Sequence, residues 1–193
     1  MRYEKGRKDE SRRRIIDAAA ERFRRDGIAA TGLAAIMADA GMTNGAFYPH
    51  FRSKAELVRE TVGAAIDGQA AQVREAVAAG GIEAVIAAYL SPAHRDSPET
   101  GCTPAALLPE MSRQPLETRQ AWADRLTGMA QDLAAALPPG TRDPQGTALA
   151  IFSTLLGSLQ LARAAAGTDL SDRMLAVGAD AARALAAASG PAA

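Results

Sequence analysis

Alanine-rich stretches run through most of this 193-residue chain, and β-branched residues nowhere form the alternating runs typical of half-buried strands. Alanine has the highest intrinsic helix propensity of all residues. Hydrophobic residues make up 48% of the chain and charged residues 23%, which is enough apolar material for a folded core. The sequence therefore predicts an all-α protein, and no segment is expected to form a strand.

The N-terminal third divides into three helices separated by glycines. The expected helices span residues 11–26, 33–40 and 44–48. Gly27 and Gly41 stand where a helix ends and the chain must turn. Thr31 and Thr43 are expected to cap the second and third helices, because a hydroxyl can accept a bond from a free N–H of the first turn.

Most of the remaining chain is also predicted to be helical. Ser53 and Glu56 have the spacing of a capping box, so a long helix starts there and runs to the Gly80-Gly81 pair. The polar stretch 91–101 is expected to be a loop. Further helices are expected at residues 82–90, from Thr103 until Pro109 kinks or ends the helix, at 115–137, from Pro144 onward and at 171–188.

The net charge is zero, but the charge is divided unevenly along the chain. Residues 1–54 hold 12 Lys and Arg against 7 Asp and Glu, whereas residues 55–193 hold 10 against 15. A basic front and an acidic remainder suit an N-terminal segment that meets phosphates.

Several classes of protein are disfavoured. With Cys102 as the single cysteine, an intramolecular disulfide and a cysteine-based zinc site within one chain are excluded. His50 and His94 lie 44 positions apart, with no carboxylate spacing around them that suggests a metal site, so we expect no metal ion. No cofactor is expected either. The first residues lack the apolar core of a signal peptide, and the most apolar window, 148–166, is interrupted by polar side chains. We therefore expect a cytoplasmic protein without a membrane partner.

Three helices in about 50 residues, the last two joined at a glycine, are typical of a helix-turn-helix. The motif Gly27-x-x-x-Thr31, followed by Ile36-x-x-x-Ala40-Gly41-Met42-Thr43-x-Gly45-x-Phe47-Tyr48-x-His50-Phe51-x-Ser53-Lys54-x-x-Leu57, closely resembles the N-terminal signature of TetR-family regulators. The resemblance covers roughly the first 60 residues. It implies a basic arm at 1–10, a DNA-binding domain at 11–56, a helical effector-binding and dimerisation domain at 57–188 and a flexible tail at 189–193.

The third helix holds the candidate base-reading residues. Asn44 can pair bidentately with adenine, and the methyl group of Ala46 can touch a thymine methyl. Gly45 leaves room for close approach to the DNA backbone, and Thr43 can offer its hydroxyl to a phosphate. The resemblance also implies phosphate contacts by Thr31, Tyr48 and Lys54. His50 belongs to the same candidate set, with a packed or capping histidine as the alternative.

The resemblance implies that the middle helices line an effector cavity and that the last two helices pair with their copies in a homodimer. The small residues Gly157, Ala162 and Gly178 would let helices of two subunits approach closely. The alternative is that these faces pack within one subunit. The candidate effector-binding residues are Tyr89, His94, Cys102, Met111, Trp122, Leu126, Met129, Phe152 and Gln160.

Cys102 stands at an expected helix start, where the helix dipole lowers a thiol pKa. This suggests a redox or electrophile sensor, with a buried, inert cysteine as the alternative. The sequence thus predicts a homodimeric repressor that leaves its near-palindromic operator when a small molecule binds or when Cys102 is modified. Two alternatives remain: a helical enzyme with Cys102 as nucleophile and His94 as base, and a ligand-blind or activating regulator with the same DNA-binding unit.

Overall fold

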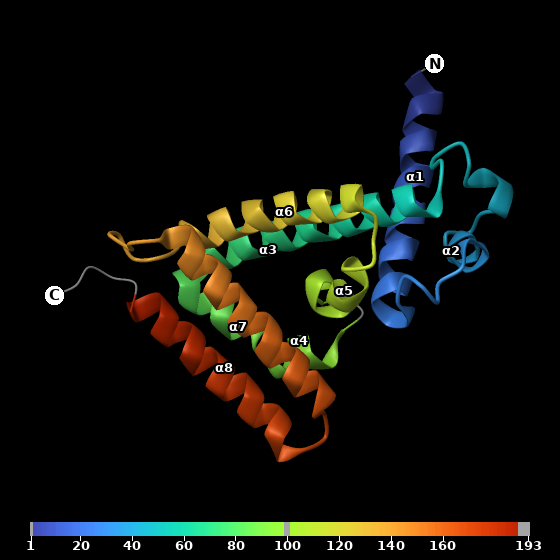
Figure 1. Ribbon diagram of the computed structural model, residues 1–193. Helices are drawn as coiled ribbons and strands as arrows, with labels where there is room; N and C mark the ends of the chain where they lie inside the picture. The colour runs from blue at the N-terminus through green and yellow to red at the C-terminus, as the bar shows by residue number, and fades with distance from the viewer. Residues whose placement is uncertain (1, 99–100, 189–193) are drawn as a thin grey trace.

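The computed structural model describes residues 2–98 and 101–188, and within these ranges the secondary structure is helical, without a strand, as predicted. The elements are α1 (Arg2–Asp26), α2 (Leu33–Asp39), the 3₁₀ turn η1 (Asn44–Ala46), α3 (Lys54–Tyr89), α4 (Pro92–Asp96), α5 (Thr103–Met111), α6 (Leu116–Ala134), α7 (Pro144–Ala164) and α8 (Asp169–Ala188). In Figure 1, α1 and α2 lie at one end of the long α3, α6 runs beside α3, and α7 and α8 form an antiparallel pair. The expected flexible tail, 189–193, lies outside the described residues.

Three elements differ from the sequence-based expectation. Residues 2–10, expected as an arm, continue α1, and the expected helix 44–48 is only the short turn η1. The expected loop 91–101 contains α4, because Ser91 accepts a hydrogen bond from the His94 N–H at 3.1 Å and Pro92 occupies the first turn. A capping residue followed by proline is a helix start signal, and it was overlooked at this position.

Two hydrophobic cores give the molecule its two halves. One core, which we call the N-terminal core, is formed by α1, α2, the first part of α3 and the end of α5, with Phe23 and Ile36 fully buried. The other is formed by the second part of α3 together with α6, α7 and α8. Helix α5 joins them, since Ala105 belongs to the second core and Leu107 and Met111 belong to the first.

The capping box at the start of α3 is confirmed. The Ser53 hydroxyl accepts from the Glu56 N–H at 3.1 Å, and the Glu56 carboxylate accepts from the Arg52 N–H at 2.7 Å. These two bonds satisfy N–H groups that have no partner inside the helix. They fix the direction in which α3 leaves the N-terminal domain.

Helix α3 is broken at Gly80 and Gly81, where the sequence predicted a helix end. Gly81 has φ +64° and ψ −154°, a combination that is essentially restricted to glycine. The chain therefore changes direction there, and residues 82–89 return along a different axis.

Replacing Gly81 with alanine should lower the free energy of unfolding by about 1–3 kcal/mol, because a Cβ makes this backbone conformation strained. Gly128, in α6, is a matched control with no atom within 4 Å of an added Cβ and no positive φ. Gly128→Ala should stabilise the protein by up to about 1 kcal/mol. Urea unfolding of both variants checks this, and an unchanged Gly81→Ala midpoint would contradict it.

Helix α7 packs closely against α8, and this corrects one expectation. Ala162 is fully buried within the subunit, and a Cβ on Gly178 would lie within van der Waals overlap of the Ser158 hydroxyl. Both residues are small because α7 and α8 pack within one subunit, so their predicted role between subunits is wrong. Gly157 is exposed. By length and composition α7 is also apolar enough to cross a membrane, a test that buried core helices pass as well.

Candidate functional site

The segment 43–48 forms an exposed surface that is supported on its inner side by the buried rings of two phenylalanines. Phe47 and Phe51 are each 1% exposed, and their stacked rings have centroids 5.5 Å apart. Because Phe47 points inward, the next residue, Tyr48, points outward and is 70% exposed. Thr43 and Asn44 are exposed as well. We call residues 43–48 the recognition segment.

Thr43, Gly45 and Ala46 leave space for another molecule to approach the recognition segment closely. Thr43 is at the N-cap position of η1, but its side chain makes no capping bond, so the predicted side-chain cap is wrong. Gly45 is exposed, and a Cβ there would meet nothing within 4 Å. Ala46 is half-buried and packs against the N-terminal core.

The position and hydrogen bonding of Thr31 differ from the sequence-based prediction. Gly32, and not Thr31, is the N-cap of α2, and no side chain caps that helix. Thr31 is 3% exposed, and its hydroxyl donates to the Gly27 carbonyl at 2.6 Å. The hydroxyl therefore stabilises the turn after α1, and the structure does not bring it to the exposed surface.

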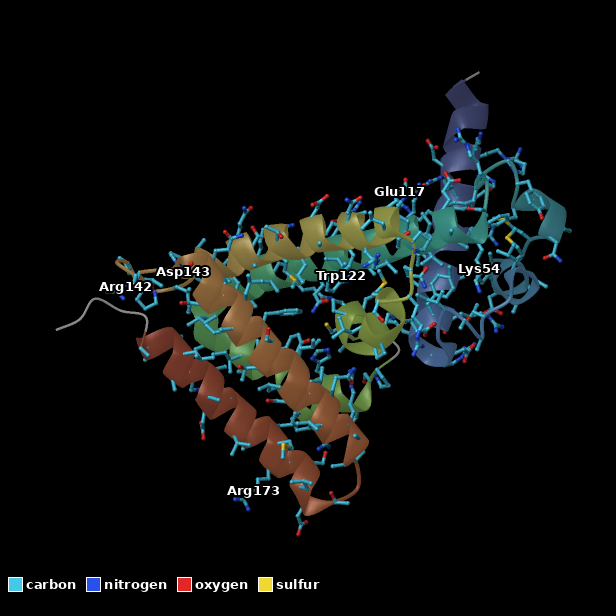
Figure 2. The ribbon with its side chains drawn as sticks, in the orientation of Figure 1. Lys54, Glu117, Trp122, Arg142, Asp143 and Arg173 are labelled. Atoms are coloured by element: carbon cyan, nitrogen blue, oxygen red, sulfur yellow. The ribbon has the colours of Figure 1, made fainter. Side chains whose placement is uncertain are left out.

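Two side chains from other parts of the chain form hydrogen bonds with the turn between α1 and α2. Lys54, at the start of α3 (Figure 2), donates to the Ile28 carbonyl at 2.6 Å. The Glu110 carboxylate, near the end of α5, accepts from the N–H groups of Ile28 and Ala29 at 3.0 and 2.8 Å. Sequence reasoning missed Glu110, because nothing in its local pattern indicates a partner about 80 positions away.

Two basic residues of α1, Lys8 and Arg12, lie close enough to His50 for their charges to act on it. Its Nδ1 is buried and has no hydrogen-bond partner among the described residues. Burial, followed by the charges of Lys8 and Arg12, lowers the pKa of His50. Arg12 also pairs with Glu60 and lies 4.7 Å from the centroid of the Phe51 ring, so its first role is to hold the N-terminal domain together.

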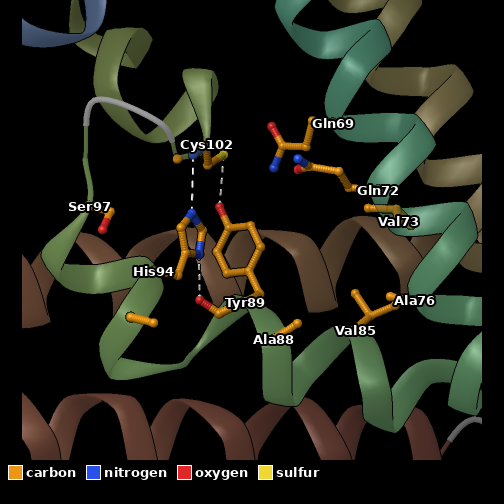
Figure 3. A pocket seen from close by; sticks show the side chains of 12 residues that line it. Gln69, Gln72, Val73, Ala76, Val85, Ala88, Tyr89, His94, Ser97 and Cys102 are labelled. Atoms are coloured by element: carbon orange, nitrogen blue, oxygen red, sulfur yellow. Dashed lines mark hydrogen bonds between the residues drawn. The ribbon is translucent and has the colours of Figure 1, made fainter.

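A cavity of about 320 Å³ opens between α3, α4 and the start of α5 (Figure 3). Its polar lining consists of Gln69, Gln72, Tyr89, His94, Ser97 and Cys102. Its apolar lining includes Val73, Ala76, Val85 and Ala88. Three of the predicted effector-binding residues, Tyr89, His94 and Cys102, thus lie together at one cavity.

The polar groups of these three residues bind one another. The Tyr89 hydroxyl donates to Cys102 Sγ at 3.0 Å, and burial raises the pKa of Tyr89, so that the hydroxyl keeps its proton. His94 Nδ1 bonds the Tyr89 carbonyl at 2.7 Å, and His94 Nε2 accepts from the Cys102 N–H at 3.1 Å. Both ring nitrogens of His94 therefore serve the backbone, and neither is placed as a base for the thiol.

Cys102 is at the N-cap of α5, as expected, but its chemistry differs from the prediction. The residue is 3% exposed, and burial raises the pKa of the thiol despite the Tyr89 donor that acts in the opposite direction. The predicted lowering of the pKa is wrong because desolvation of the thiolate outweighs the helix N-terminus.

The other predicted effector-binding residues lie elsewhere. Met129 and Phe152 line a smaller, neighbouring apolar cavity. Leu126 packs against the core that α3, α6, α7 and α8 form. Gln160 donates to the Ala105 carbonyl. Met111 is buried in the N-terminal core, against which Trp122 also packs from α6 (Figure 2). Helical spacing identified these side chains as inward-facing but could not assign them to a cavity.

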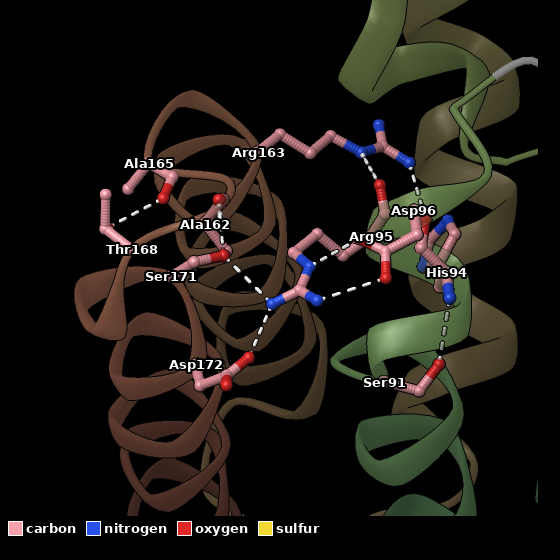
Figure 4. Close-up of polar contacts among 10 residues, drawn as sticks. All are labelled: Ser91, His94, Arg95, Asp96, Ala162, Arg163, Ala165, Thr168, Ser171 and Asp172. Carbon is pink, nitrogen blue, oxygen red and sulfur yellow. Dashed lines mark hydrogen bonds and ion pairs between the residues drawn. The ribbon is translucent and has the colours of Figure 1, made fainter.

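The cavity wall at α4 is fixed to the α7–α8 pair by a polar network (Figure 4). Arg95 pairs with Asp172 at 2.5 Å and donates to the Ser171 hydroxyl at 2.9 Å. Arg163 donates to the carbonyls of His94 and Arg95 at 2.8 and 3.1 Å. These contacts hold His94 in place at the cavity.

Stability should depend on pH through His94. Burial lowers its pKa below the ordinary 6.5, so the unfolded chain binds a proton that the folded chain refuses. This contribution is present above the unfolded pKa and is lost as pH falls towards the folded pKa. Between about pH 7 and about pH 5, the free energy of unfolding should therefore fall more steeply in the wild type than in His94→Gln. His50 titrates in both proteins, so equal slopes in urea unfolding would contradict the prediction.

Residues 15–61 match the sequence model of the bacterial regulatory proteins of the tetR family. Over this segment the chain is similar to TetR-family regulators. Fifty residues are 52% identical to the HTH-type transcriptional regulator TtgR and to the probable HTH-type transcriptional regulator ArpR, both of Pseudomonas putida. That stretch is 26% of this chain and 24% of each relative, so the match spans about a quarter of their length.

About nine-tenths of the chain has the fold of solved TetR-family structures and of similar regulators. The reduced form of Escherichia coli NemR matches with a TM-score of 0.74 and 18% identity, covering 91% of this chain and 96% of NemR. FadR of Bacillus subtilis, solved in complex with stearoyl-CoA, matches with a TM-score of 0.66 and 18% identity, covering 90% and 96%. A putative TetR-family regulator from Mesorhizobium loti is 23% identical, with a TM-score of 0.63 and coverage of 95% and 98%. At these identities the likeness establishes the fold alone.

Proposed function

We propose that this protein is a homodimeric, cytoplasmic repressor that binds a near-palindromic operator in double-stranded DNA and leaves it when a small molecule enters the cavity. The observation that carries the proposal is the recognition segment, which presents Thr43, Asn44 and Tyr48 outward on a support of buried aromatic rings. An exposed, polar segment beside basic side chains suits the major groove.

Within this proposal the residues divide into two roles. Asn44 and Ala46 read base edges, and Gly45 allows the backbone to come close. The proposed phosphate contacts are Thr43, Tyr48, His50 and Lys54. Lys54 keeps N–H donors beyond the one it gives to Ile28. Thr31 is left out of the set because its hydroxyl is buried and already bonded.

The homodimer is supported by apolar side chains on the outer faces of α7 and α8. Leu149 and Leu161 of α7 are 40% and 56% exposed, and Leu170 and Val177 of α8 are 50% and 48% exposed. Large apolar side chains gathered on neighbouring helices favour a protein–protein contact. Pairing with a second copy would bury these faces and place two recognition segments on one DNA duplex.

Two helices connect the cavity with the DNA-binding half. Helix α5 follows its N-cap residue Cys102, which lines the cavity. The same helix carries Glu110, whose carboxylate accepts hydrogen bonds from the turn between α1 and α2. Helix α3 begins at the Ser53 cap and carries the cavity residue Gln69. We propose that a ligand shifts these helices and so changes the spacing of the two recognition segments. FadR, which was solved with stearoyl-CoA, supports a ligand-binding role for this fold.

Modification of Cys102 is the second proposed route to release. The observation that favours it is the position of Cys102 in the cavity wall, where an electrophilic ligand would meet the sulfur. Burial raises the pKa of the thiol and so reduces the thiolate that reacts, which is why we place non-covalent binding first. Release of DNA by a quinone that persists unchanged in Cys102→Ser would exclude this route.

Tyr48→Phe should weaken DNA binding by about tenfold, the usual value of one lost hydrogen bond. Because a phosphate contact carries no sequence information, operator and unrelated DNA should lose affinity equally. Fluorescence anisotropy with both duplexes measures this. Unchanged affinity, or a loss confined to the operator, would contradict the proposed role of Tyr48.

A further inference from the structure

The size of the cavity limits what it can hold. Its volume of about 320 Å³ is at the lower end of the range for small-molecule sites, which runs from about 300 to about 1,000 Å³. Tyr89, His94, Ser97 and Cys102 lie on one side of the cavity, and Val73, Ala76 and Val85 lie on the other, with Gln69 and Gln72 beside Val73 (Figure 3). A ligand that fits must be compact and must have one polar and one apolar end.

The charge of the lining limits the ligand further. No Lys, Arg, Asp or Glu from the described ranges lines the cavity. The Arg163 guanidinium, which lies behind the α4 wall, is bonded to the carbonyls of His94 and Arg95. Arg163 keeps its charge but does not line the cavity, so an ionic ligand would give up its hydration without direct contact with an opposite charge, which is costly. The cavity therefore favours an uncharged molecule.

The hydrogen bonds within the lining decide which polar group the ligand must bring. The Tyr89 hydroxyl, the His94 ring and the Cys102 N–H are already bonded to one another. The Gln69 side chain also hydrogen-bonds the Cys102 thiol, but its Oε1 is buried and has no hydrogen-bond partner among the described residues. A buried acceptor without a partner is costly, and a donor on a ligand would remove that cost.

We propose that the cavity binds a compact, uncharged, amphipathic molecule whose hydroxyl or N–H group donates to Gln69 Oε1 and whose apolar part packs against Val73 and Val85. This inference rests on the proposed function, because it names the class of effector for the same cavity. It excludes carboxylates, phosphates and ammonium compounds as the main ligands.

Four probes of one shape test the ligand class: 4-butylbenzyl alcohol, its methyl ether, 4-butylbenzoate and 4-butylbenzylammonium. We expect calorimetry on the full chain to show the alcohol binding at least about tenfold more tightly than each of the others, the value of one hydrogen bond or more. Tighter binding of either ion, or no binding of the alcohol, would overturn the proposal.

Gln69→Met tests the named acceptor, because methionine keeps the length of the side chain and removes the oxygen. The variant should bind the alcohol and the ether equally, while Gln131→Met, at an exposed position of α6, should keep the wild-type preference. A preference for the alcohol that survives in Gln69→Met would overturn the role of Gln69. DNA binding is measured separately: an alcohol that binds without releasing DNA supports this ligand class and contradicts the proposed coupling, whereas intact DNA binding with no binding of the alcohol overturns the ligand class alone.

Discussion

Asn44→Glu should weaken binding to the operator by about 100-fold, which corresponds to about 2.8 kcal/mol. Asn44 is exposed at the start of η1, where its amide can donate and accept at an adenine edge. A carboxylate has no donor for the adenine acceptor and is repelled by the phosphates on either side. Because the side chain is exposed, the fold and its unfolding midpoint should stay unchanged.

The control for this variant is Gln131→Glu, which adds the same charge at an exposed position of α6. Screening limits the influence of a surface charge to about 8 Å at physiological ionic strength, so this variant should bind DNA like the wild type. Fluorescence anisotropy titrations of the wild type, Asn44→Glu and Gln131→Glu with operator DNA test this prediction. Equal losses in both variants would mean that net charge, and not the recognition segment, governs DNA binding.

If the protein is the proposed homodimer, Leu161→Glu should convert it to a monomer at concentrations where the wild type is dimeric. Leu161 is 56% exposed on the outer face of α7, and two-fold symmetry places each substitution in the interface twice. Burying an unpaired carboxylate costs several kcal/mol. Because the proposed operator has paired half-sites, the variant should also lose most of its affinity for DNA.

Leu116→Glu is the matched control, since Leu116 is 59% exposed at the start of α6, away from α7 and α8. It should remain dimeric in sedimentation velocity. If Leu161→Glu stays dimeric as well, the outer face of α7 is not the subunit contact, and the proposed assembly is wrong.

The N-terminal domain was predictable because its signals are local. Gly41 takes a positive φ of 68° between α2 and η1, and the spacing of Phe47 and Phe51 places both rings on the buried side. Thr31 was mispredicted because a hydroxyl next to a helix start can equally bond the preceding turn, and here it bonds Gly27.

The cavity was less predictable because burial does not distinguish one core from another. Met111 and Cys102 both lie on α5, yet the first packs in the N-terminal core and the second lines the cavity. Gln69 was missed, since a glutamine on a long helix carries no signal of an unpartnered buried oxygen. The partners of Glu110 depend on how α5 crosses the two cores, which only the tertiary structure defines.

Selection of binding sites from a pool of random double-stranded DNA tests the central claim most directly. A homodimeric DNA-binding regulator should enrich inverted repeats whose half-site centres lie about 34 Å, or a multiple of this, apart. The affinity for the enriched duplex should fall linearly with salt concentration on a double-logarithmic plot. Enrichment of no sequence, enrichment of isolated half-sites, or binding that does not change with salt would contradict the account.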